Sequence, residues 1–331
     1  MKIFFLISGL LLLPLTSNAD QLISQQAGFT PFIERMVKQH HFEREPLIHL
    51  FKGIKVREDI LKAISRPAEK SKEWFEYRPI FIKESRIKGG VEFWNKHEKI
   101  LQQAAQKYGV DPQIIVAIIG VETLYGQRTG RNRVIESLST IAFAYPKRSK
   151  FFTRELEHFL LLTREENIDP AKAKGSYAGA MGQSQFISSS YRHYAIDADG
   201  DGQRDLWNSP HDIIASVANY FKKHGWKAGE PITSRATVQG DGYTHFLNKK
   251  LKPEADLSEM LRHGISTDDQ LNPQQKAKLI EFKLKQGLEY WVALHNFYVI
   301  TRYNHSSMYA MAVYQLSEAI RQRRAHHSDQ T

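Results

Sequence analysis

Glu122 is the residue whose position most suggests acid–base chemistry. It follows the segment 114–121, which contains only Ile, Val, Ala and Gly and would be apolar on every face of a helix. Burial disfavours a charged carboxylate, so we expect the pKa of Glu122 to be raised. A carboxyl group that is protonated near neutral pH can donate a proton to a glycosidic oxygen. A solvated glutamate at a helix end is the alternative, and the residues alone favour it.

An acidic segment has the spacing of a calcium-binding loop. Positions 1, 3, 5, 6 and 9 of such a loop are filled by Asp197, Asp199, Asp201, Gly202 and Asp205. Alternate carboxylates supply the hard oxygen ligands that Ca²⁺ prefers, and the glycine allows the sharp turn. We therefore expect a structural Ca²⁺ that joins a short helix at 183–194 to a helix at 210–224. A solvated acidic turn is the alternative.

Two further residues complete the candidate metal site, and one departs from the pattern. Gln203, at position 7, would contribute its main-chain carbonyl oxygen. Position 12 is normally Glu but is Asn208 here, which should weaken the affinity and makes Na⁺ an alternative ion. Asp212 could reach back to the metal if the loop is longer than usual. Its alternative role is the N3 residue of a helix cap that begins at Ser209.

Composition excludes several other kinds of chemistry. The chain of 331 residues has no cysteine, which excludes disulfides, thiolate zinc sites, cysteine nucleophiles and lipid-modified cysteines. It contains no His-Glu-x-x-His zinc motif, no Gly-x-Ser-x-Gly elbow and no phosphate-binding loop. The 46 Lys and Arg exceed the 36 Asp and Glu, and the net charge of +10 predicts an acidic partner such as nucleic acid, a membrane surface or an anionic polymer.

The N-terminus has the pattern of a secretory signal peptide. Lys2 precedes an uncharged apolar run at 3–15, and small residues stand at Ser17 and Ala19. The run is shorter than the ~20 residues that a spanning helix needs. We expect cleavage after Ala19 and a periplasmic protein without a stable membrane anchor; an uncleaved anchor or a buried helix is the alternative. The cell wall, rather than nucleic acid, is then the expected anionic partner.

The first half of the chain predicts mainly helices. Thr30 and Pro31 suit the start of a helix that ends near residue 42, and Asp111 and Pro112 suit the start of the apolar helix that carries Glu122. The aromatic segment 74–79 ends on a proline and suggests an extended connector. Other helices are expected at 45–54, 57–64, 91–108 and 151–166.

The second half of the chain changes in character at Trp226. Before it, we expect helices at 183–194 and at 210–224, the second of which starts at Ser209-Pro210. The segment 226–297 predicts a small mixed insert with short strands, and a last helix is expected at 306–323. The polar tail 321–331 suggests fraying. The expected fold class is mainly α, with a small α+β part.

Several of these segments occur in one order in a known family. They are the helix end 120–123, the small-residue loop 176–186, the acidic loop 197–202 ahead of Leu206-Trp207, and the segments 216–221 and 302–304. In this ordered set the chain resembles the lytic murein transglycosylase B family. The resemblance implies a lysozyme-like core at 76–225 and 298–325, an N-terminal helical domain at 20–75, a mixed insert domain at 226–297 and an EF-hand-like metal loop at 197–212.

The resemblance also implies a function and site residues. The family cleaves the β-1,4 bond between N-acetylmuramic acid and N-acetylglucosamine in peptidoglycan, so glycan strands are the expected partner of a monomeric enzyme. Glu122 matches the family's single catalytic acid and base. The family's glycan-contacting positions are matched by Tyr77, Ser176, Gln185, Phe186, Tyr303 and Asn304. Lys147 and Arg148 match a basic pair in which Lys replaces the expected first Arg, which weakens a bidentate role. Packing is the alternative role for each groove residue.

A single carboxyl group implies an unusual mechanism. Most glycosidases use two carboxyl groups. With only Glu122, the 2-acetamido group of muramic acid would act as the internal nucleophile, and the C6 hydroxyl would then close a 1,6-anhydro ring. Glu136 or Glu155 could instead be a second carboxylate, which would make the protein a lysozyme-like hydrolase. A non-catalytic wall-binding protein is another alternative. A calcium buffer is disfavoured because there is one loop and no second loop to pair with it.

Overall fold

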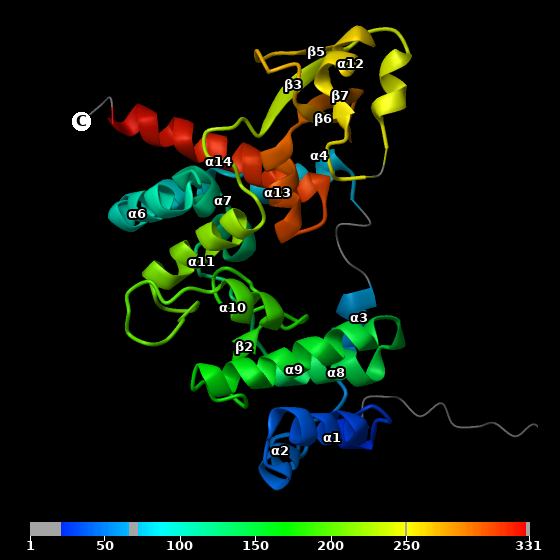
Figure 1. The fold of residues 1–331 in the computed structure, drawn as a ribbon, viewed down its shortest axis with the longest axis vertical. Coiled ribbons are helices and arrows are strands. Elements are labelled where there is room, and N and C mark those ends of the chain that lie inside the picture. Colours follow the sequence, from blue (N-terminus) through cyan, green and yellow to red (C-terminus); the bar gives the residue numbers. More distant parts are fainter. Residues whose placement is uncertain (1–20, 66–71, 249, 329–331) are drawn as a thin grey trace, which may run out of the picture.

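The protein is elongated, with a small sheet at one end and short helices at the other (Figure 1). The computed structural model describes residues 21–65, 72–248 and 250–328. The predicted signal peptide at 1–19 lies outside the described residues. Within these described ranges, no helix is both long enough and apolar enough to cross a membrane.

One end of the molecule is a helical layer that begins with the N-terminal segment. Its helices and short turns are η2 (Ile23–Gln25), α1 (Phe29–His40), α2 (Arg44–Leu50), α3 (Glu58–Ser65), α8 (Val134–Ala144), η4 (Pro146–Arg148), α9 (Ser149–Glu165) and α10 (Ser188–Tyr194). Phe32 and Met36 of α1 share one buried apolar cluster with Leu156 and Phe159 of α9. The N-terminal helices therefore bury their apolar faces against α8 and α9. The domain boundaries given above stay a prediction.

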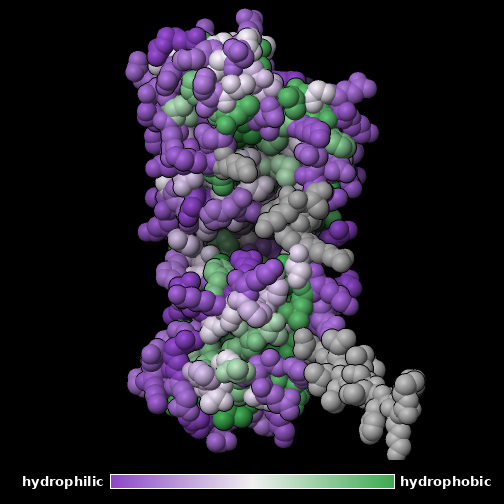
Figure 2. All heavy atoms as spheres, turned by 90° about the vertical axis from the view of Figure 1, so that its right-hand side faces the viewer, coloured by the Kyte–Doolittle hydropathy of each residue, from purple (hydrophilic) through white to green (hydrophobic). Residues whose placement is uncertain are grey.

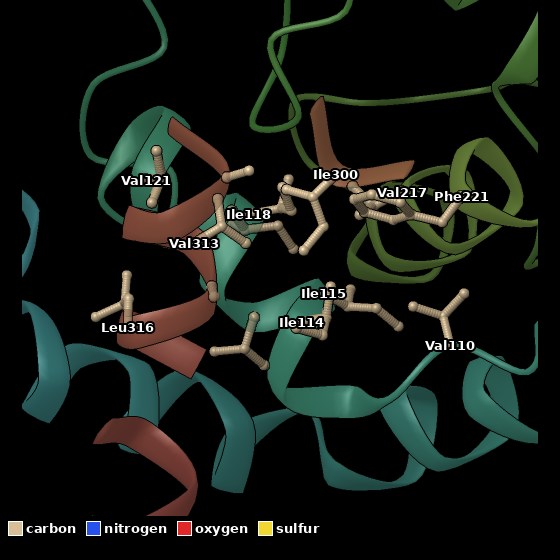
Figure 3. Packing of buried hydrophobic residues seen from close by; sticks show 14 of the residues in the cluster. Val110, Ile114, Ile115, Ile118, Val121, Val217, Phe221, Ile300, Val313 and Leu316 are labelled. Atoms are coloured by element: carbon tan, nitrogen blue, oxygen red, sulfur yellow. The ribbon is translucent and has the colours of Figure 1, made fainter. Parts of the chain in front are cut away.

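The centre of the molecule is built around the apolar helix α7 (Pro112–Thr123). The helices around it are α4 (Trp74–Phe81), α5 (Glu84–Lys96), α6 (Glu98–Tyr108), α11 (Pro210–Lys223), α13 (His295–Tyr303) and α14 (Ser307–Ser328). Ile114, Ile115 and Ile118 are fully buried, as expected for a helix that is apolar on every face. Figure 3 shows them between Val313 and Leu316 of α14 on one side and residues of α11 on the other.

A five-stranded antiparallel sheet forms the other end. Its strands are β3 (Thr233–Val238), β4 (Ala255–Asp256), β5 (Ile265–Thr267), β6 (Lys276–Lys283) and β7 (Leu288–Ala293), in the order β4-β6-β7-β3-β5. The sheet has its own buried cluster with α12 (Leu257–Arg262), and η5 (Gly242–Phe246) also contributes to it. This confirms the mixed texture predicted for 226–297. Figure 2 shows that hydrophilic side chains cover most of the upper part of one face, whereas hydrophobic ones reach the surface lower down.

Some predicted elements are wrong. The segment 74–79 is not an extended connector but the helix α4, in which the Glu73 backbone N–H donates to the Glu76 carboxylate at 3.0 Å and Trp74 is buried. Burial of an aromatic side chain here outweighs the helix-breaking tendency of Pro79. The single helix expected at 91–108 is two helices, α5 and α6, which meet at His97.

Other differences concern helices that the sequence patterns did not reveal or bounded wrongly. The helices α8 and α13 were not predicted, because no side chain caps the start of either helix and α8 is also buried on most of its faces. α10 begins only at Ser188, after a turn at 182–185. The tail expected to fray at 321 is helical to Ser328, where Arg323 pairs with Glu84 at 2.5 Å and Arg324 pairs with Glu98 at 2.5 Å.

Candidate active site

The end of α7 is held in place by a half-buried arginine. The guanidinium of Arg86 donates hydrogen bonds to the carbonyl of Gly120 and, at 3.4 Å, to that of Val121. A cation at the C-terminal end of a helix is favourable because the free carbonyls are negative there. Burial lowers the pKa of Arg86, and Tyr125 donates to its backbone carbonyl at 2.8 Å. The turn that carries Glu122 is therefore fixed from outside the helix.

Glu122 is half-buried and accepts a hydrogen bond from a tyrosine far away in the sequence. The hydroxyl of Tyr309, in the first turn of α14, donates to Glu122 Oε1 at 2.6 Å. Tyr309 is 2% exposed, and burial followed by the charge of Glu122 raises its pKa well above the usual value. Tyr309 therefore stays protonated and acts as a donor. Tyr309 is not predicted as a site residue from the sequence, because it has no local signal beyond an apolar helix face.

The turn after the small-residue loop connects Glu122 to the acidic loop. The hydroxyl of Thr123 donates to the Gln183 carbonyl at 2.9 Å, and the Gln183 N–H donates to the Leu206 carbonyl at 2.8 Å. Gly182, the residue before Gln183, has a left-handed backbone conformation, and a Cβ at this position would stand 2.4 Å from the Leu206 carbonyl oxygen. Movement of the acidic loop would therefore reach the residue next to Glu122.

A groove of about 560 Å³ brings together four of the predicted glycan-contacting residues. Its lining includes Arg148, Gln185, Phe186 and Tyr303. The Tyr303 hydroxyl donates to the Ser184 carbonyl at 2.6 Å, and burial followed by the charge of Glu122 raises its pKa. Tyr303 thus lies beside the catalytic candidate as well as in the groove. Tyr220 also lines the groove, with its ring 4.8 Å from that of Tyr303, and is not predicted as a site residue from the sequence.

The other predicted substrate residues lie outside the lining of this groove. The Oγ of Ser176 accepts the N–H groups of Ala178 and Ala180, at 3.3 and 3.0 Å, and so orders the small-residue loop. Tyr77 is 3% exposed, and it is one of the smaller causes of the raised pKa of Tyr309, so it lies near the Glu122–Tyr309 pair. Lys147 is exposed in η4, and Asn304 is the C-cap residue of α13.

The two carboxylates considered as partners of Glu122 have local partners instead. Glu136 pairs with Arg57 at 3.0 Å and also with Arg133. Glu155 is 4% exposed, and it accepts hydrogen bonds from the backbone N–H and the hydroxyl of Ser189 at 3.0 and 2.8 Å. The pair with Arg57 ties α8 to the segment just before α3, and the hydrogen bonds from Ser189 tie α9 to α10.

Three carboxylates of the acidic loop gather at one point. Oxygens of Asp197, Asp199 and Asp212 lie within 4.8 Å of one another. Asp212 is fully buried, and its two oxygens accept the N–H groups of Ala198 and Asp205 at 2.7 and 2.8 Å. Burial raises the pKa of Asp212. A buried carboxylate beside two others is an arrangement that a hard cation would stabilise, so the residues fit a Ca²⁺ ion.

The remaining loop residues make hydrogen bonds within the loop. Asp201 accepts the N–H of Gln203 at 2.8 Å, and Asp205 accepts those of Trp207 and Asn208 at 2.8 and 3.0 Å. Their carboxylates are not part of the three-residue group. The alternative predicted for Asp212 also holds, since its N–H donates to the Ser209 hydroxyl at 3.3 Å. Asp212 is thus both a cap residue and a member of the cluster.

Comparison with known proteins gives consistent relatives. A family model described as a transglycosylase SLT domain matches residues 24–318. The chain is 42% identical over 298 residues to the membrane-bound lytic murein transglycosylase B of Escherichia coli K12, covering 87% of this chain and 81% of that protein. Soluble lytic transglycosylase SltB1 from Pseudomonas aeruginosa has a similar structure, with a TM-score of 0.85 and 49% identity over 89% of this chain and 98% of its own.

Two further solved structures are similar and were determined with bound molecules. The Escherichia coli lytic transglycosylase Slt35 in complex with calcium has a TM-score of 0.85 and 41% identity, covering 94% of this chain and 98% of its own. SltB3 from Pseudomonas aeruginosa in complex with NAG-NAM-pentapeptide has a TM-score of 0.80 and 30% identity, covering 91% of this chain and 80% of its own.

Proposed function

The chain belongs to the transglycosylase SLT domain family and is a peptidoglycan lytic transglycosylase, and from this premise we propose that Glu122 is its sole catalytic acid and base. The reaction is cleavage of the β-1,4 bond between N-acetylmuramic acid and N-acetylglucosamine, with formation of a 1,6-anhydro-N-acetylmuramic acid end. The observation that carries the role of Glu122 is its 2.6 Å hydrogen bond from the protonated Tyr309. This bond orients the carboxyl group whether or not it carries a proton.

The steps balance with one carboxyl group. Protonated Glu122 gives its proton to the glycosidic oxygen, and the bond from that oxygen to C1 of muramic acid breaks. The carbonyl oxygen of the 2-acetamido group bonds to C1 and forms an oxazolinium ion. The Glu122 carboxylate then takes the proton of the C6 hydroxyl, and O6 displaces the acetamido oxygen from C1. Glu122 ends protonated as it began, and no water is consumed.

Participation of the substrate is supported by the surroundings of the other carboxylates. A conventional glycosidase places a second carboxylate across the scissile bond. Glu136 and Glu155 are occupied by the arginines and by Ser189 described above. This favours the transglycosylase mechanism over the lysozyme-like hydrolase for this chain.

The groove supports binding of a glycan strand. Tyr303 is a ring of the kind that packs against the apolar faces of sugars, and Gln185 and Arg148 add polar groups. Phe186 is only 2% exposed and supports the Tyr303 ring, 5.8 Å away, from within the protein. Ser176, Tyr77, Asn304 and Lys147 would extend the contacts beyond this lining. We propose that the chain acts on the strand as a monomer, in the periplasm, after cleavage at Ala19 and without a membrane anchor.

The acidic loop supports a structural role for Ca²⁺, with Na⁺ as the alternative ion. Asp197, Asp199 and Asp212 would hold the ion, and the ion would neutralise the charge that these carboxylates concentrate. Asp201, Gln203 and Asp205 would complete the EF-hand-like loop. With the loop ordered, Leu206 supports Gln183 and, through it, the residue next to Glu122.

Mass spectrometry of the products tests this function. Purified peptidoglycan incubated with the mature protein should release muropeptides about 18 Da lighter than hydrolysis products, because ring closure replaces the addition of one water. Glu122→Gln should release about 10²–10⁴-fold less product in the same time, whereas Glu259→Gln, a change of the same type in the insert, should release as much as the unmodified protein. Hydrated ends would show that the protein is a hydrolase, and undiminished release from Glu122→Gln would refute the role of Glu122.

A further inference from the structure

A cavity of about 450 Å³ lies on a different face of α10 from the groove that Tyr303 lines. It is bounded by the segment 166–174 after α9, by the second half of the acidic loop at 203–208, and by Tyr191 of α10. Among the described residues, the cavity and the groove share no lining residue. We call this cavity the loop pocket. Its volume is within the ~300–1,000 Å³ that small-molecule sites usually have.

The walls of the loop pocket are fixed by buried hydrogen bonds. Glu166, which is 8% exposed, accepts the backbone N–H and the Nε of Arg204, each at 2.8 Å. Tyr191 is fully buried, and its hydroxyl donates to the Arg204 carbonyl and accepts the Leu206 N–H at 3.2 Å. Because these side chains are already held in place, a ligand that binds here does not have to order them.

Trp207 is the aromatic wall of the loop pocket. Its side chain is partly exposed, and its ring centroid is 5.9 Å from that of Tyr191. The indole Nε1 donates to the Lys174 carbonyl at 3.3 Å, and the backbone N–H donates to Asp205 at 2.8 Å. The ring is therefore held from both ends and gives the cavity a flat apolar surface. A pyranose ring, with C–H groups on its faces and hydroxyls at its edge, matches such a surface with polar neighbours.

Acidic and basic side chains balance in the loop pocket. Arg204 pairs with Glu166, and Lys172 pairs with Asp169 at 3.1 Å. A chain with a net charge of +10 has basic side chains in excess, so a cavity that holds the two signs equally favours an uncharged polar ligand. N-Acetylglucosamine is the uncharged sugar of peptidoglycan, whereas muramic acid carries a lactyl carboxyl or a peptide. The charged lining residues are Glu166, Asp169, Asp205, Lys172, Lys174 and Arg204.

We propose that the loop pocket is a second glycan-binding site, in which an N-acetylglucosamine unit packs on Trp207 and the amides of Gln203 and Asn208 bond to its polar groups. The identity of the ligand rests on the proposed function, but the site takes no part in cleavage. Peptidoglycan repeats the same sugars on every strand, so the pocket can hold one strand while the groove acts on another. Two linked weak sites keep the enzyme on the wall more firmly than either alone, without a new contact near Glu122.

Nuclear magnetic resonance of the tryptophan indoles tests occupancy of the site. The full mature chain carrying Glu122→Gln has five indole N–H groups, and the signal of Trp207 is identified by its loss in Trp207→Phe. Titration with chitotriose, the trisaccharide of N-acetylglucosamine, should move this signal in a saturable way, and the signals of the buried Trp74 and Trp94 should stay. Asp169→Ala, at the rim of the pocket, should raise the dissociation constant read from Trp207 about threefold or more.

Two substrates test what the site does. Trp207→Ala should release products from intact sacculi about tenfold more slowly than the unmodified protein, because an aromatic anchor is lost. It should cleave a soluble peptide-free tetrasaccharide, which needs the groove alone, with unchanged kcat/KM. Tyr243→Ala, which truncates a partly exposed aromatic residue of the insert, is the matched control and should equal the unmodified protein on both substrates. A retained increase of Tm with Ca²⁺ shows that Trp207→Ala leaves the acidic loop folded.

Each outcome separates the second site from the catalytic function. A Trp207 signal that does not move, or whose dissociation constant Asp169→Ala leaves unchanged, would refute the site, and this titration decides even if Trp207→Ala does not fold. Equal slowing on both substrates would also refute it and assign Trp207 to support of the catalytic turn, through the bond from Gln183 Nε2 to the Trp207 carbonyl at 3.0 Å. Equal rates on sacculi would overturn the anchoring role. Absence of 1,6-anhydro products from the unmodified protein would refute the proposed function, whatever the Trp207 signal does.

Discussion

Glu122 and Asp212 are both carboxylates at helix ends, and their surroundings are opposite. Glu122 lies in the last turn of α7, half-exposed, with a neutral tyrosine hydroxyl at 2.6 Å. Asp212 lies in the first turn of α11, fully buried, with two backbone N–H donors and two neighbouring carboxylates. A helix C-terminus disfavours negative charge and a helix N-terminus favours it.

The difference shows how one functional group serves two tasks. A carboxyl group that must exchange a proton needs access to substrate and an environment that accepts both of its states. A carboxylate that must hold a metal needs to stay charged and fixed. The two sites are joined by the Leu206–Gln183–Thr123 connection, so the second can support the first without taking part in the reaction.

Removal of the Glu122 carboxyl should have the largest effect. Glu122→Gln keeps the size of the side chain but cannot exchange a proton, so kcat should fall by about 10²–10⁴-fold. The midpoint of thermal unfolding should change little, since no buried charge is left unpaired. Turnover of peptidoglycan and calorimetric unfolding measure the two effects. If Glu122→Gln lost activity only because the protein became less stable, Glu122 would have a structural role like that of Asp212.

Removal of calcium should have the next largest effect, and it should act on stability. A ligand at about 100 times its dissociation constant stabilises the folded state by roughly 2.7 kcal/mol, or about 4 °C in Tm for a protein of this size. We expect this increase when Ca²⁺ is added to the chelator-treated protein. Asp212→Asn should abolish the increase, whereas Asp241→Asn, an exposed residue of the insert, should preserve it. An equal Tm with calcium and with chelator would argue against a structural ion.

Removal of the Tyr309 hydroxyl should have the smallest effect of the three. Tyr309→Phe deletes one hydrogen bond to Glu122, for which about 1–2 kcal/mol or roughly tenfold in kcat/KM is expected. The pH profile of kcat/KM should also move to higher pH, because the charged carboxylate loses a donor. Tyr303→Phe is the comparison, since that hydroxyl donates to the Ser184 carbonyl instead. An unshifted profile for Tyr309→Phe would mean that the tyrosine only packs.

The sequence by itself determined the features that depend on short-range interactions. Asp111-Pro112 and Ser209-Pro210 do start α7 and α11, and the apolar run 114–121 is buried as its composition predicts. The spacing of the aspartates in 197–205 identified an acidic turn, and the ordered motifs identified the family. These signals lie within a few residues of one another, where caps, turns and periodicity act.

Only the tertiary structure decided which distant residues meet. Tyr309 is 187 positions from Glu122, and the two come together because α14 packs along α7. Folding of the acidic loop onto the start of α11 placed Asp212, rather than Asp201 or Asp205, with Asp197 and Asp199. Burial of Trp74 favoured a helix in the segment 74–81. Burial and long-range contacts are properties of the whole packed chain. Local propensity can therefore predict that a helix carries a glutamate, but not which hydroxyl will face it.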